Sequence, residues 1–447
     1  MSFPRYPKYK HSGVEWLGEV PEGWKISRLG FESWVRARLG WKGLKAEEYV
    51  DDGFVFLSTP NIKPICIDFE DVNYIDAVRY EESPEIKLRV GDVLLAKDGS
   101  TLGTVNVVRF LPRPSTVNSS IAVITPNSSL DGIFLFYMFQ STYMDDTIQR
   151  IKGGMGVPHL FQADLNKFYI PVPQTSEQMA IAAFLDRETA KIDALVEEQR
   201  RLIELLKEKR QAVISHAVTK GLNPHAKMKP SGIEWLGDVP EHWEVMPIRY
   251  AARLESGHTP SRNHPEYWEN CKRPWFTLSD IWQVREAGKD IITETSEMVS
   301  DIGLANSSAR LLPKGTVMLS RTASVGFSAI MGCDMATSQD FANWVCGERL
   351  LPGYLLLVFR SMHGEFEKLK FGSTHNTIYM PDIQAFRLAL PSLTEQKHII
   401  RYVSERLLKI DSLVAEANRA IDLLQERRTA LTSAAVTGKI DVRGCQA

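Results

Sequence analysis

The longest regular pattern of hydrophobic and polar positions in the chain is a seven-residue repeat, which occurs in two separate blocks, residues 173–222 and 391–440. Charged residues fill most of the positions between the apolar ones. This spacing is typical of a long helix that packs against a second helix along one seam. The seam is predicted to contain Ile192, Leu195, Leu202, Leu206 and Val213 in the first block, and Ile410, Leu413, Leu424 and Leu431 in the second.

Each block predicts a helix of about 43 residues, or about 65 Å at about 1.5 Å per residue. Ser176 and Thr394, which follow prolines and precede Glu-Gln, could cap these helices. A helix of this length cannot cover its apolar stripe alone. We therefore expect the two helices to pack on each other as an antiparallel coiled coil with an internal pseudo-two-fold repeat. The alternative is that each helix packs only on its own globular region.

A second repeated block opens each half of the chain. Residues 12–24 recur as residues 231–243, shifted by 219 positions, and the helical blocks are shifted by 218. Such nearly equal shifts indicate two halves of matched length. The predicted organisation is a first domain at residues 1–172, a helical spacer at 173–222, a second domain at 223–390, and a second spacer with the C-terminal tail at 391–447.

The regions between the repeated blocks have diverged, but their patterns still align. Residues 87–95 and 311–319 each place a turn glycine before a short apolar run, which is typical of a strand entered from a tight turn. Helices are predicted near residues 134–150 and 353–368. The fold class is therefore α+β, with two mixed α/β domains separated by two long helices.

Composition narrows the class of protein. The 447 residues carry a formal net charge of −2, so the chain lacks the overall basic field of many small nucleic-acid binders. A nucleic-acid partner would need local basic surfaces or another basic subunit. The five scattered cysteines fit neither a disulfide framework nor zinc spacing. Neither a secretory signal nor an apolar run of about 18 residues is present, and a cytoplasmic location is expected.

The usual catalytic signatures are missing. The sequence contains no phosphate-binding loop that ends in Lys-Ser or Lys-Thr, and no Asp/Asn-Pro-Pro-aromatic motif of a DNA amino-methyltransferase. Residues 153–156 are glycine-rich but do not follow a strand of a βαβ unit. The histidines lack metalloprotease spacing, and Glu85-Ile86-Lys87 is best interpreted as a solvated charge run. We predict a chain with no catalytic residues and no bound metal.

Several motifs together carry a family resemblance. The second half reads Gly-His-Thr-Pro-Ser from Gly257, and each helical block begins with Glu-Gln, contains Lys-Ile-Asp and ends on Ala-Val-Thr. This order of motifs occurs twice and covers essentially the full chain. It resembles the specificity subunit of type I restriction-modification enzymes. The first half departs from the pattern at residues 38–44, which replace the Gly-x-Thr-Pro signature. That departure weakens residue-by-residue transfer to the first half.

The resemblance implies a non-catalytic subunit with two target recognition domains, each reading one half of a bipartite double-stranded DNA sequence. The helices would set the unread spacer and dock two modification subunits, which bind S-adenosylmethionine. Restriction subunits, where present, would use ATP with Mg²⁺. A coiled-coil scaffold without DNA readout is the alternative, whereas the missing signatures argue against a self-contained restriction enzyme.

Polar loop residues of the diverged regions are the candidate DNA contacts, because these residue types grip phosphates and read base edges. About half of them could instead be turn formers or phosphate contacts. Arg321 is the preferred base contact, since arginine can donate two hydrogen bonds to guanine. Trp16, Trp24, Trp235 and Trp243, repeated in both halves, are expected to be buried scaffold. The predicted contacts are Ser58, Asn61, Lys97, Ser100, Thr101, Asn118, Lys152 and His159 in the first half, and Ser279, Arg321, Thr322, Ser324, Gln339, Ser373, His375 and Asn376 in the second.

Overall fold

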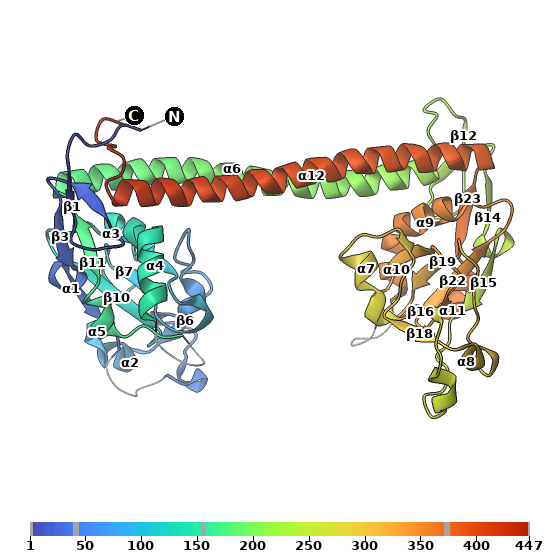
Figure 1. The fold of residues 1–447 in the computed structure, drawn as a ribbon, viewed down its shortest axis with the longest axis horizontal. Helices are drawn as coiled ribbons and strands as arrows, with labels where there is room; N and C mark the ends of the chain where they lie inside the picture. Colours follow the sequence, from blue (N-terminus) through green and yellow to red (C-terminus); the bar gives the residue numbers. More distant parts are fainter. Residues whose placement is uncertain (1–2, 39–43, 153–157, 371–375, 446–447) are drawn as a thin grey trace. The chain divides into compact units, whose positions relative to one another are not determined.

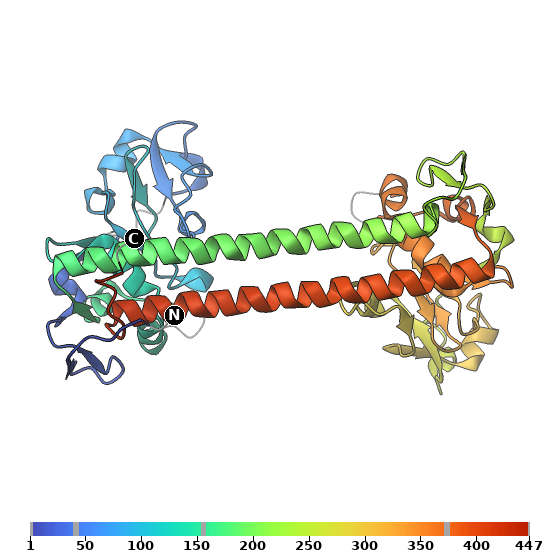
Figure 2. The ribbon, with the colours of Figure 1, turned by 90° about the horizontal axis from the view of Figure 1, so that it is seen from above.

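The chain folds into two compact units. The computed structural model describes residues 3–38, 44–152, 158–370 and 376–445. Unit 1 comprises residues 1–199 and 418–447, and unit 2 comprises residues 200–417. The long helices α6 (Thr175–Thr219) and α12 (Leu393–Val436) each contribute one part to unit 1 and the other part to unit 2 (Figures 1 and 2). Each helix lies inside one of the predicted helical blocks.

Unit 1 is built on a four-stranded antiparallel sheet and a three-stranded sheet (Figure 1). Strand β7 is buried on both faces, because its alternate side chains enter different hydrophobic clusters: Val93 and Leu95 face one, and Leu94 the other. The strand orders are β4 (Ser33–Arg36), β10 (Ile121–Pro126), β7 (Val93–Ala96) and β8 (Val105–Val107), then β6 (Asn73–Ile75), β5 (Phe54–Leu57) and β9 (Ser115–Val117). Two further pairs are β1 (Tyr9–His11) with β2 (Glu19–Pro21), and β3 (Lys25–Arg28) with β11 (Tyr169–Val172).

Unit 2 contains a five-stranded and a three-stranded sheet. In the smaller sheet β16 pairs with β21 in parallel, as β5 pairs with β9 in unit 1. The strand orders are β15 (Ala252–Ser256), β22 (Phe341–Cys346), β19 (Val317–Ser320), β20 (Ser328–Met331) and β17 (Ile291–Ile292), then β18 (Glu297–Val299), β16 (Arg273–Phe276) and β21 (Ala336–Thr337). The remaining pairs are β12 (Met228–Pro230) with β13 (Asp238–Pro240), and β14 (Glu244–Pro247) with β23 (Arg387–Leu390).

The helices predicted near residues 134–150 and 353–368 are each two helices. In unit 1 the break falls at Gln140 and Ser141, and the Ser141 hydroxyl caps the second helix by accepting from the Met144 amide. In unit 2 the break falls at Met362. The helices are α1 (Leu29–Glu32), α2 (Ala77–Glu81), α3 (Gly132–Phe139), α4 (Thr142–Ile151) and α5 (Gln162–Leu165) in unit 1, and α7 (Trp282–Arg285), α8 (Asp301–Ala305), α9 (Pro352–Ser361), α10 (His363–Leu369) and α11 (Met380–Gln384) in unit 2.

A buried glutamine anchors the start of each long helix. The Gln178 side-chain amide donates to the carbonyls of Ser129 and Pro173, both at 2.8 Å, and its carbonyl accepts from the Asp131 amide. Gln396 makes the equivalent bonds in unit 2 to Arg349, Pro391 and Leu351. These bonds give the glutamine of each Glu-Gln motif a structural role. Ser176 and Thr394 lie inside the first helical turns, so their prediction as caps is wrong.

The buried stripe of each long helix follows a seven-residue repeat, but its second position differs from the prediction. Leu195, Leu202 and Leu413, predicted in the seam, are exposed, which corrects that part of the prediction. Within each repeat, the second buried position comes four residues after the first, whereas three were predicted; Val196, four residues after Ile192, is an example. The positions of this stripe, each buried or half-buried, are 192, 196, 199, 203, 206, 210, 213 and 217 in α6, and 403, 407, 410, 414, 417, 421, 424, 428, 431 and 435 in α12.

An ion pair recurs on these stripes within each unit. In unit 1 the Arg428 Nε lies 2.9 Å from the Asp193 carboxylate, and in unit 2 Arg210 pairs with Asp411. Both pairs join α6 to α12. Arg428 and Arg210 each occupy a half-buried position of the repeat.

The four repeated tryptophans differ in burial, and Trp235 is half-buried against the hydrophobic cluster of unit 2. Trp24 and Trp243 are fully buried, as expected of scaffold. Trp16 is exposed and lies under the Arg150 guanidinium, 4.9 Å from ring centroid to Cζ, which corrects its prediction as buried. Among the described residues, no helix combines the length and apolar character that a bilayer crossing requires.

Candidate nucleic-acid interface

In unit 1 three polar segments meet where strand β7 ends. The Lys97 amide donates to the Ser120 carbonyl at 2.9 Å, and the Leu160 amide donates to the Lys97 carbonyl at 2.9 Å. Gly99 donates to Pro158 at 3.0 Å. We call these segments, residues 97–103, 118–120 and 158–160, the β7 corner. Main-chain hydrogen bonds hold the three segments together, so the segments do not depend on their side chains to stay in contact with one another.

The β7 corner brings together predicted contacts that lie far apart in the sequence. The Asp98 carboxylate contacts the Lys97 ammonium at 3.3 Å and also the His159 Nδ1. Asn118 accepts a hydrogen bond from the Ser120 amide at 3.1 Å and so shapes its own turn. The predicted contacts gathered at this corner are Lys97, Ser100, Thr101, Asn118 and His159.

Unit 2 has the same frame at the end of strand β19. The Arg321 amide donates to the Asp340 carbonyl at 2.9 Å, and the Ile378 amide donates to the Arg321 carbonyl at 2.8 Å. Ala323 donates to Asn376 at 2.9 Å. We call residues 321–326, 338–340 and 376–378 the β19 corner. It gathers the predicted contacts Arg321, Thr322, Ser324, Gln339 and Asn376.

The Arg321 guanidinium is braced by the main chain of its own corner. Its Nε donates to the Gln339 carbonyl at 2.9 Å, and its Nη1 donates to the Ile378 carbonyl at 3.4 Å. These bonds fix the plane of the guanidinium before any ligand arrives. Because a guanidinium carries five N–H donors, three remain for other acceptors.

An exposed aromatic residue follows each corner. Phe161 is 58% exposed and Tyr379 is 55% exposed, and they stand one residue after Leu160 and Ile378, which bond to the corners. Singly exposed apolar residues are ordinary. An exposed aromatic residue nevertheless occurs at the same place beside both polar corners. The sequence alone did not predict this feature.

In the turns after β5 and β16, predicted DNA contacts have hydrogen-bond partners within the fold. Asn61 is buried, its Oδ1 accepts from the Ser58 amide at 2.8 Å, and its Nδ2 donates to the Asp71 carbonyl at 2.7 Å. Both ends of this amide are therefore bonded within the fold, and the DNA contact at Asn61 stays a prediction. Ser58 is half-buried in the same capping turn.

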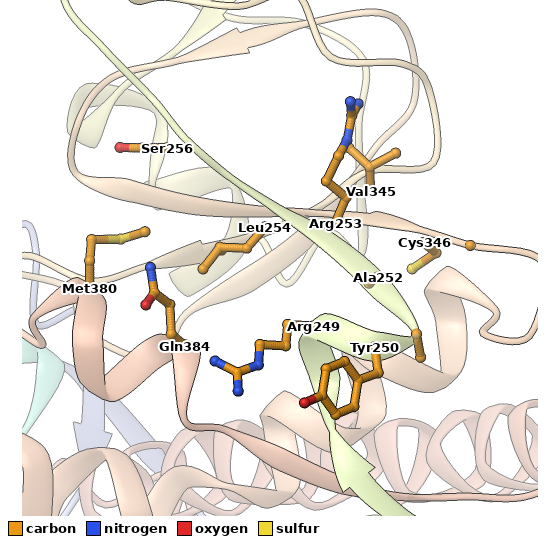
Figure 3. A pocket seen from close by; sticks show the side chains of 12 residues that line it. Arg249, Tyr250, Ala252, Arg253, Leu254, Ser256, Val345, Cys346, Met380 and Gln384 are labelled. Atoms are coloured by element: carbon orange, nitrogen blue, oxygen red, sulfur yellow. The ribbon is translucent and has the colours of Figure 1, made fainter.

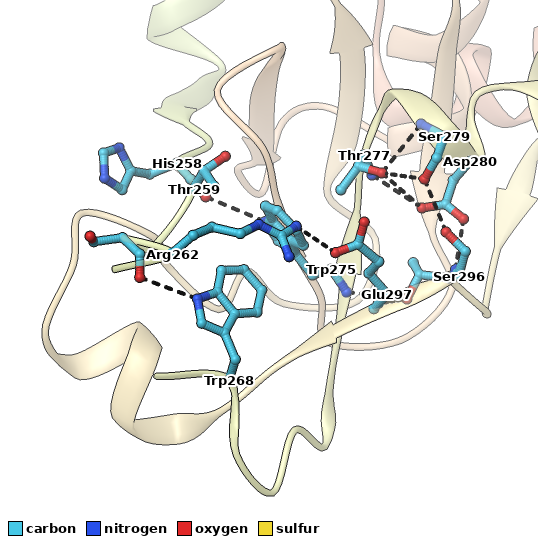
Figure 4. Close-up of polar contacts among 12 residues, drawn as sticks. His258, Thr259, Arg262, Trp268, Trp275, Thr277, Ser279, Asp280, Ser296 and Glu297 are labelled. Atoms are coloured by element: carbon cyan, nitrogen blue, oxygen red, sulfur yellow. Dashed lines mark hydrogen bonds and ion pairs between the residues drawn. The ribbon is translucent and has the colours of Figure 1, made fainter. Parts of the chain in front are cut away.

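In unit 2 the Ser279 hydroxyl is similarly engaged, with Thr277 Oγ1 at 2.6 Å and Ser296 Oγ at 3.0 Å (Figure 4). Lys152 follows α4, and its ammonium donates to the Gln149 side chain. Among the described residues, its main chain makes no hydrogen bond with the β7 corner. Ser373 and His375 lie outside the described residues.

Sequence reasoning missed two residues that the corners involve. Asp98 was not among the predicted contacts, and only the fold shows that its carboxylate contacts Lys97 and His159. Thr259, in the Gly-His-Thr-Pro stretch, donates to the side chain of Gln339, 80 positions away. No local sequence signal predicts a contact over that separation.

A shallow pocket of about 800 Å³ lies in unit 2 beside the edge strand β15 (Figure 3). Arg249, Tyr250 and Arg253 line it from one side, and Met380 and Gln384 of α11 from the other. Its lining holds no histidine or carboxylate. Burial raises the pKa of the Cys346 thiol in this lining to about 12, so the thiol is not an activated nucleophile. Among the described residues, no group of three or more metal-ligating side chains is close enough to hold a metal ion.

A family model and several relatives match most of the chain. A model of the type I restriction modification DNA specificity domain matches residues 46–205 and 240–418, more than half of the chain. The MjaVIII specificity subunit of Methanocaldococcus jannaschii is 24% identical over 95% of this chain and 94% of its own length. The EcoKI specificity subunit of Escherichia coli (strain K12) is 21% identical over 95% and 90%.

Two solved structures share the fold. A chain from a study of complex assembly and conformational transition of the type I R-M system matches with a TM-score of 0.70 at 18% identity, over 96% of this chain and 99% of that one. The HsdS subunit from Thermoanaerobacter tengcongensis matches with a TM-score of 0.56 at 17% identity, over 94% and 98%. The chain therefore belongs to the family of type I restriction-modification DNA specificity proteins.

Proposed function

We propose that each unit reads one half of a bipartite double-stranded DNA sequence, unit 1 at the β7 corner and unit 2 at the β19 corner. As a family member the chain supplies sequence specificity and carries no catalytic step. The recognition domains correspond to residues 1–172 and 223–390. The observation that carries the proposal is the shared main-chain frame of the two corners, on which different polar side chains stand.

The chemistry of the corners suits two different half-sites. The β7 corner presents a carboxylate that contacts both a lysine ammonium and an imidazole. The β19 corner presents an arginine and an amide side chain instead. Arginine and glutamine are the side chains that most often read purine edges in the major groove, and lysine commonly contacts phosphates. The two corners share one pattern of main-chain hydrogen bonds but carry different side-chain donors and acceptors. Two domains that recognise different DNA sequences require this combination.

The partners follow from the type I restriction enzymes after which the relatives are named. The chain would assemble with two modification subunits, which bind S-adenosylmethionine and methylate DNA. Restriction subunits that use ATP with Mg²⁺ would join them where the system cuts DNA. This chain would bind neither cofactor itself. The near-zero net charge supports a division of labour, because the other subunits would then supply part of the positive surface around DNA.

The helices would set the distance between the two half-sites and dock the modification subunits. In this proposal α6 and α12 form one antiparallel coiled coil with an internal pseudo-two-fold repeat. Two observations support it: the continuous seven-residue spacing of buried positions in each helix, and the recurrence of the Asp193–Arg428 ion pair as Asp411–Arg210. Both ion pairs place an arginine at the same position of the repeat.

Arg321→Ala tests the assignment of the β19 corner. The chain is co-expressed with its modification subunit, and the methylated motif is determined by methylome sequencing. Losing a two-bond guanine contact costs about 1–3 kcal/mol, so discrimination should fall at one position of one half-site. The other half-site and the spacer should stay unchanged. Lys97→Ala, made in the same way, should affect only the opposite half-site.

An Arg321→Ala motif identical to that of the unchanged chain would remove Arg321 as a reader. The same experiment separates the scaffold interpretation from DNA readout. A stable complex with the modification subunit that yields no split motif would favour a scaffold. A split motif with one methylated adenine in each half supports the reader.

A further inference from the structure

The geometry points to Thr259 as a positioning residue for specificity: it orients the Gln339 side chain so that unit 2 selects, at one position, a base whose major-groove edge offers a hydrogen-bond acceptor. This inference rests on the proposed function of the β19 corner and deepens it. Gln339 is the exposed middle residue of the turn between β21 and β22. A glutamine at such a place can present either its carbonyl or its amide group, unless a neighbour fixes which.

Thr259 is such a neighbour. Its hydroxyl donates to the Gln339 Oε1. With its carbonyl oxygen facing the Thr259 hydroxyl, the Gln339 side chain turns its Nε2 amide group away from Thr259. In the main chain of the same residue, the Gln339 carbonyl accepts from the Arg321 Nε at 2.9 Å. The half-buried Arg321 guanidinium, which bonds to this turn, and the exposed Gln339 amide therefore both present donors.

The loop that carries Thr259 is fixed by its own main chain. The His258 amide donates to the Thr337 carbonyl at 2.9 Å, and the Gly257 amide donates to the Phe341 carbonyl at 3.3 Å. A Cβ at position 257 would lie 1.9 Å from the Ser338 carbonyl oxygen, so only glycine permits this approach. The close approach places Thr259 beside the turn that carries Gln339.

Aromatic packing holds the other end of the loop (Figure 4). The Arg262 guanidinium stacks on Trp268, 4.4 Å from the ring centroid, and its Nη2 pairs with Glu297 at 2.8 Å. The Trp275 Nε1 donates to the His258 carbonyl at 3.3 Å. The arginine of this loop is therefore occupied, and its role is to hold the loop. A loop held at both ends can keep the Thr259 hydroxyl in one place.

The orientation of the amide determines which base pairs are accepted. A donor at Gln339 matches the acceptors on guanine (N7 and O6), adenine (N7) and thymine (O4). It does not match the N4 amino group of cytosine, which is itself a donor. Unit 2 should therefore exclude cytosine on the contacted strand at one position. Without Thr259 the amide can rotate by about 180° and accept from that amino group.

The test compares Thr259→Val, which removes the hydroxyl with little change of shape, with Thr259→Ser, which keeps it. Each full-length variant is co-expressed with the modification subunit, and base frequencies in the methylated motif are measured. Thr259→Val should admit cytosine at one position of the unit 2 half-site, with discrimination lowered about 10-fold. Thr259→Ser should keep the original motif. The unit 1 half-site and the spacer should not change in either variant.

A second variant keeps the test decisive if Thr259→Val gives no methylation. In Gln339→Glu the side chain presents only acceptors, and the Thr259 hydroxyl can still donate to it. This variant should prefer cytosine at the same position. An unchanged motif in Gln339→Glu would overturn the inference.

The failure of this inference can be told apart from failure of the proposed function. If Thr259→Val keeps the original motif while Gln339→Ala relaxes one position, Thr259 has no positioning role. If neither variant changes the motif but Arg321→Ala does, the pair does not read DNA and the β19 corner remains the reader. If none of the three changes the motif, the assignment of DNA readout to this corner is itself wrong.

Discussion

Residues 99 and 323 occupy the same place in the two corners and share an unusual backbone conformation. Gly99 has φ of 72° and Ala323 has φ of 58°, both in the left-handed region. Each amide donates to the segment that crosses the corner, Pro158 in one and Asn376 in the other. The left-handed turn aims that amide at its acceptor. Glycine adopts this conformation freely, whereas alanine is strained there by about 1–2 kcal/mol.

A matched pair of substitutions measures this strain. Gly99→Ala should destabilise unit 1 by about 1 kcal/mol, because a Cβ meets no atom within 4 Å there and only the backbone conformation opposes it. Ala323→Gly should leave unit 2 equally or slightly more stable, because relief of strain offsets the greater freedom of glycine in the unfolded chain. Hydrogen exchange of the β7 and β19 amides reports each unit separately. Equal protection of β7 in Gly99→Ala and the unchanged chain would contradict the strain argument.

At the residue scale, the sequence predicted where polar loop residues lie but not their partners. Lys97 and Arg321 were correctly placed after strands, because polar residues that follow an apolar run commonly lie at the end of a strand. The burial of Asn61 was not predicted, because a buried capping amide and an exposed amide look the same in a sequence. The Thr259–Gln339 contact joins residues 80 positions apart, and only the folded loop shows it.

At the scale of elements, each long helix packs through the buried stripe of side chains on one of its faces. Leu206 and Leu205 are neighbours in α6, yet Leu206 is 6% exposed and Leu205 is 52% exposed. Leu206 belongs to the hydrophobic cluster of unit 2 together with Val403, Leu407 and Ile410 of α12. The helix therefore offers a buried leucine and an exposed control within one turn.

Leu206→Ala should destabilise unit 2 by about 2–4 kcal/mol, because removing a buried leucine loses apolar burial and leaves a cavity. Leu205→Ala should change the free energy of unfolding by less than about 0.5 kcal/mol, as most exposed substitutions do. Urea unfolding followed by circular dichroism compares the two variants. Similar midpoints for both would mean that the stripe through Leu206 does not stabilise the helix.

The sequence predicted the existence of the long helices and half of their stripe. The position at Ile192, Leu206 and Ile410 was correct, because a repeat of seven persists over the whole block. The second position was placed three residues later, on Leu195 and Leu202, since leucine is the stronger hydrophobic signal. The stripe instead runs through positions four residues later, including Arg210, whose charge is matched by Asp411. A pattern of hydrophobicity cannot identify an arginine as a seam residue.

At the scale of the whole molecule, the proposal that the helices set the spacer can be tested by length. Seven residues are inserted after Leu206 and seven after Leu424, the equivalent position 218 residues later. A seven-residue insertion preserves the repeat and adds about 10.5 Å of helix at about 1.5 Å per residue. At about 3.4 Å per base pair this corresponds to about 3 more base pairs of spacer. Methylome sequencing should show both half-sites unchanged.

A four-residue insertion at the same two places provides the control. It lengthens the helices but shifts the buried stripe out of phase, so it should weaken the pairing of α6 with α12 and reduce methylation. Recognition of different bases after the seven-residue insertion would contradict the proposed role of the helices. The spacing of the two repeated blocks predicted the duplication itself, whereas the order of strands inside each unit required the structure.

The main-chain bonds that hold the corners also affect how the protein can evolve. Because amides and carbonyls join residues 97–103 to residues 118–120 and 158–160, most exposed side chains there can be exchanged without breaking the frame. Substitutions at such positions should have small effects on stability, so many are accessible one at a time. A lineage could thus acquire a new target sequence by point mutation while the helices and the partner subunits stay the same. Variation in the recognised DNA sequence would then arise from the exposed side chains of the corners, which contribute least to folding.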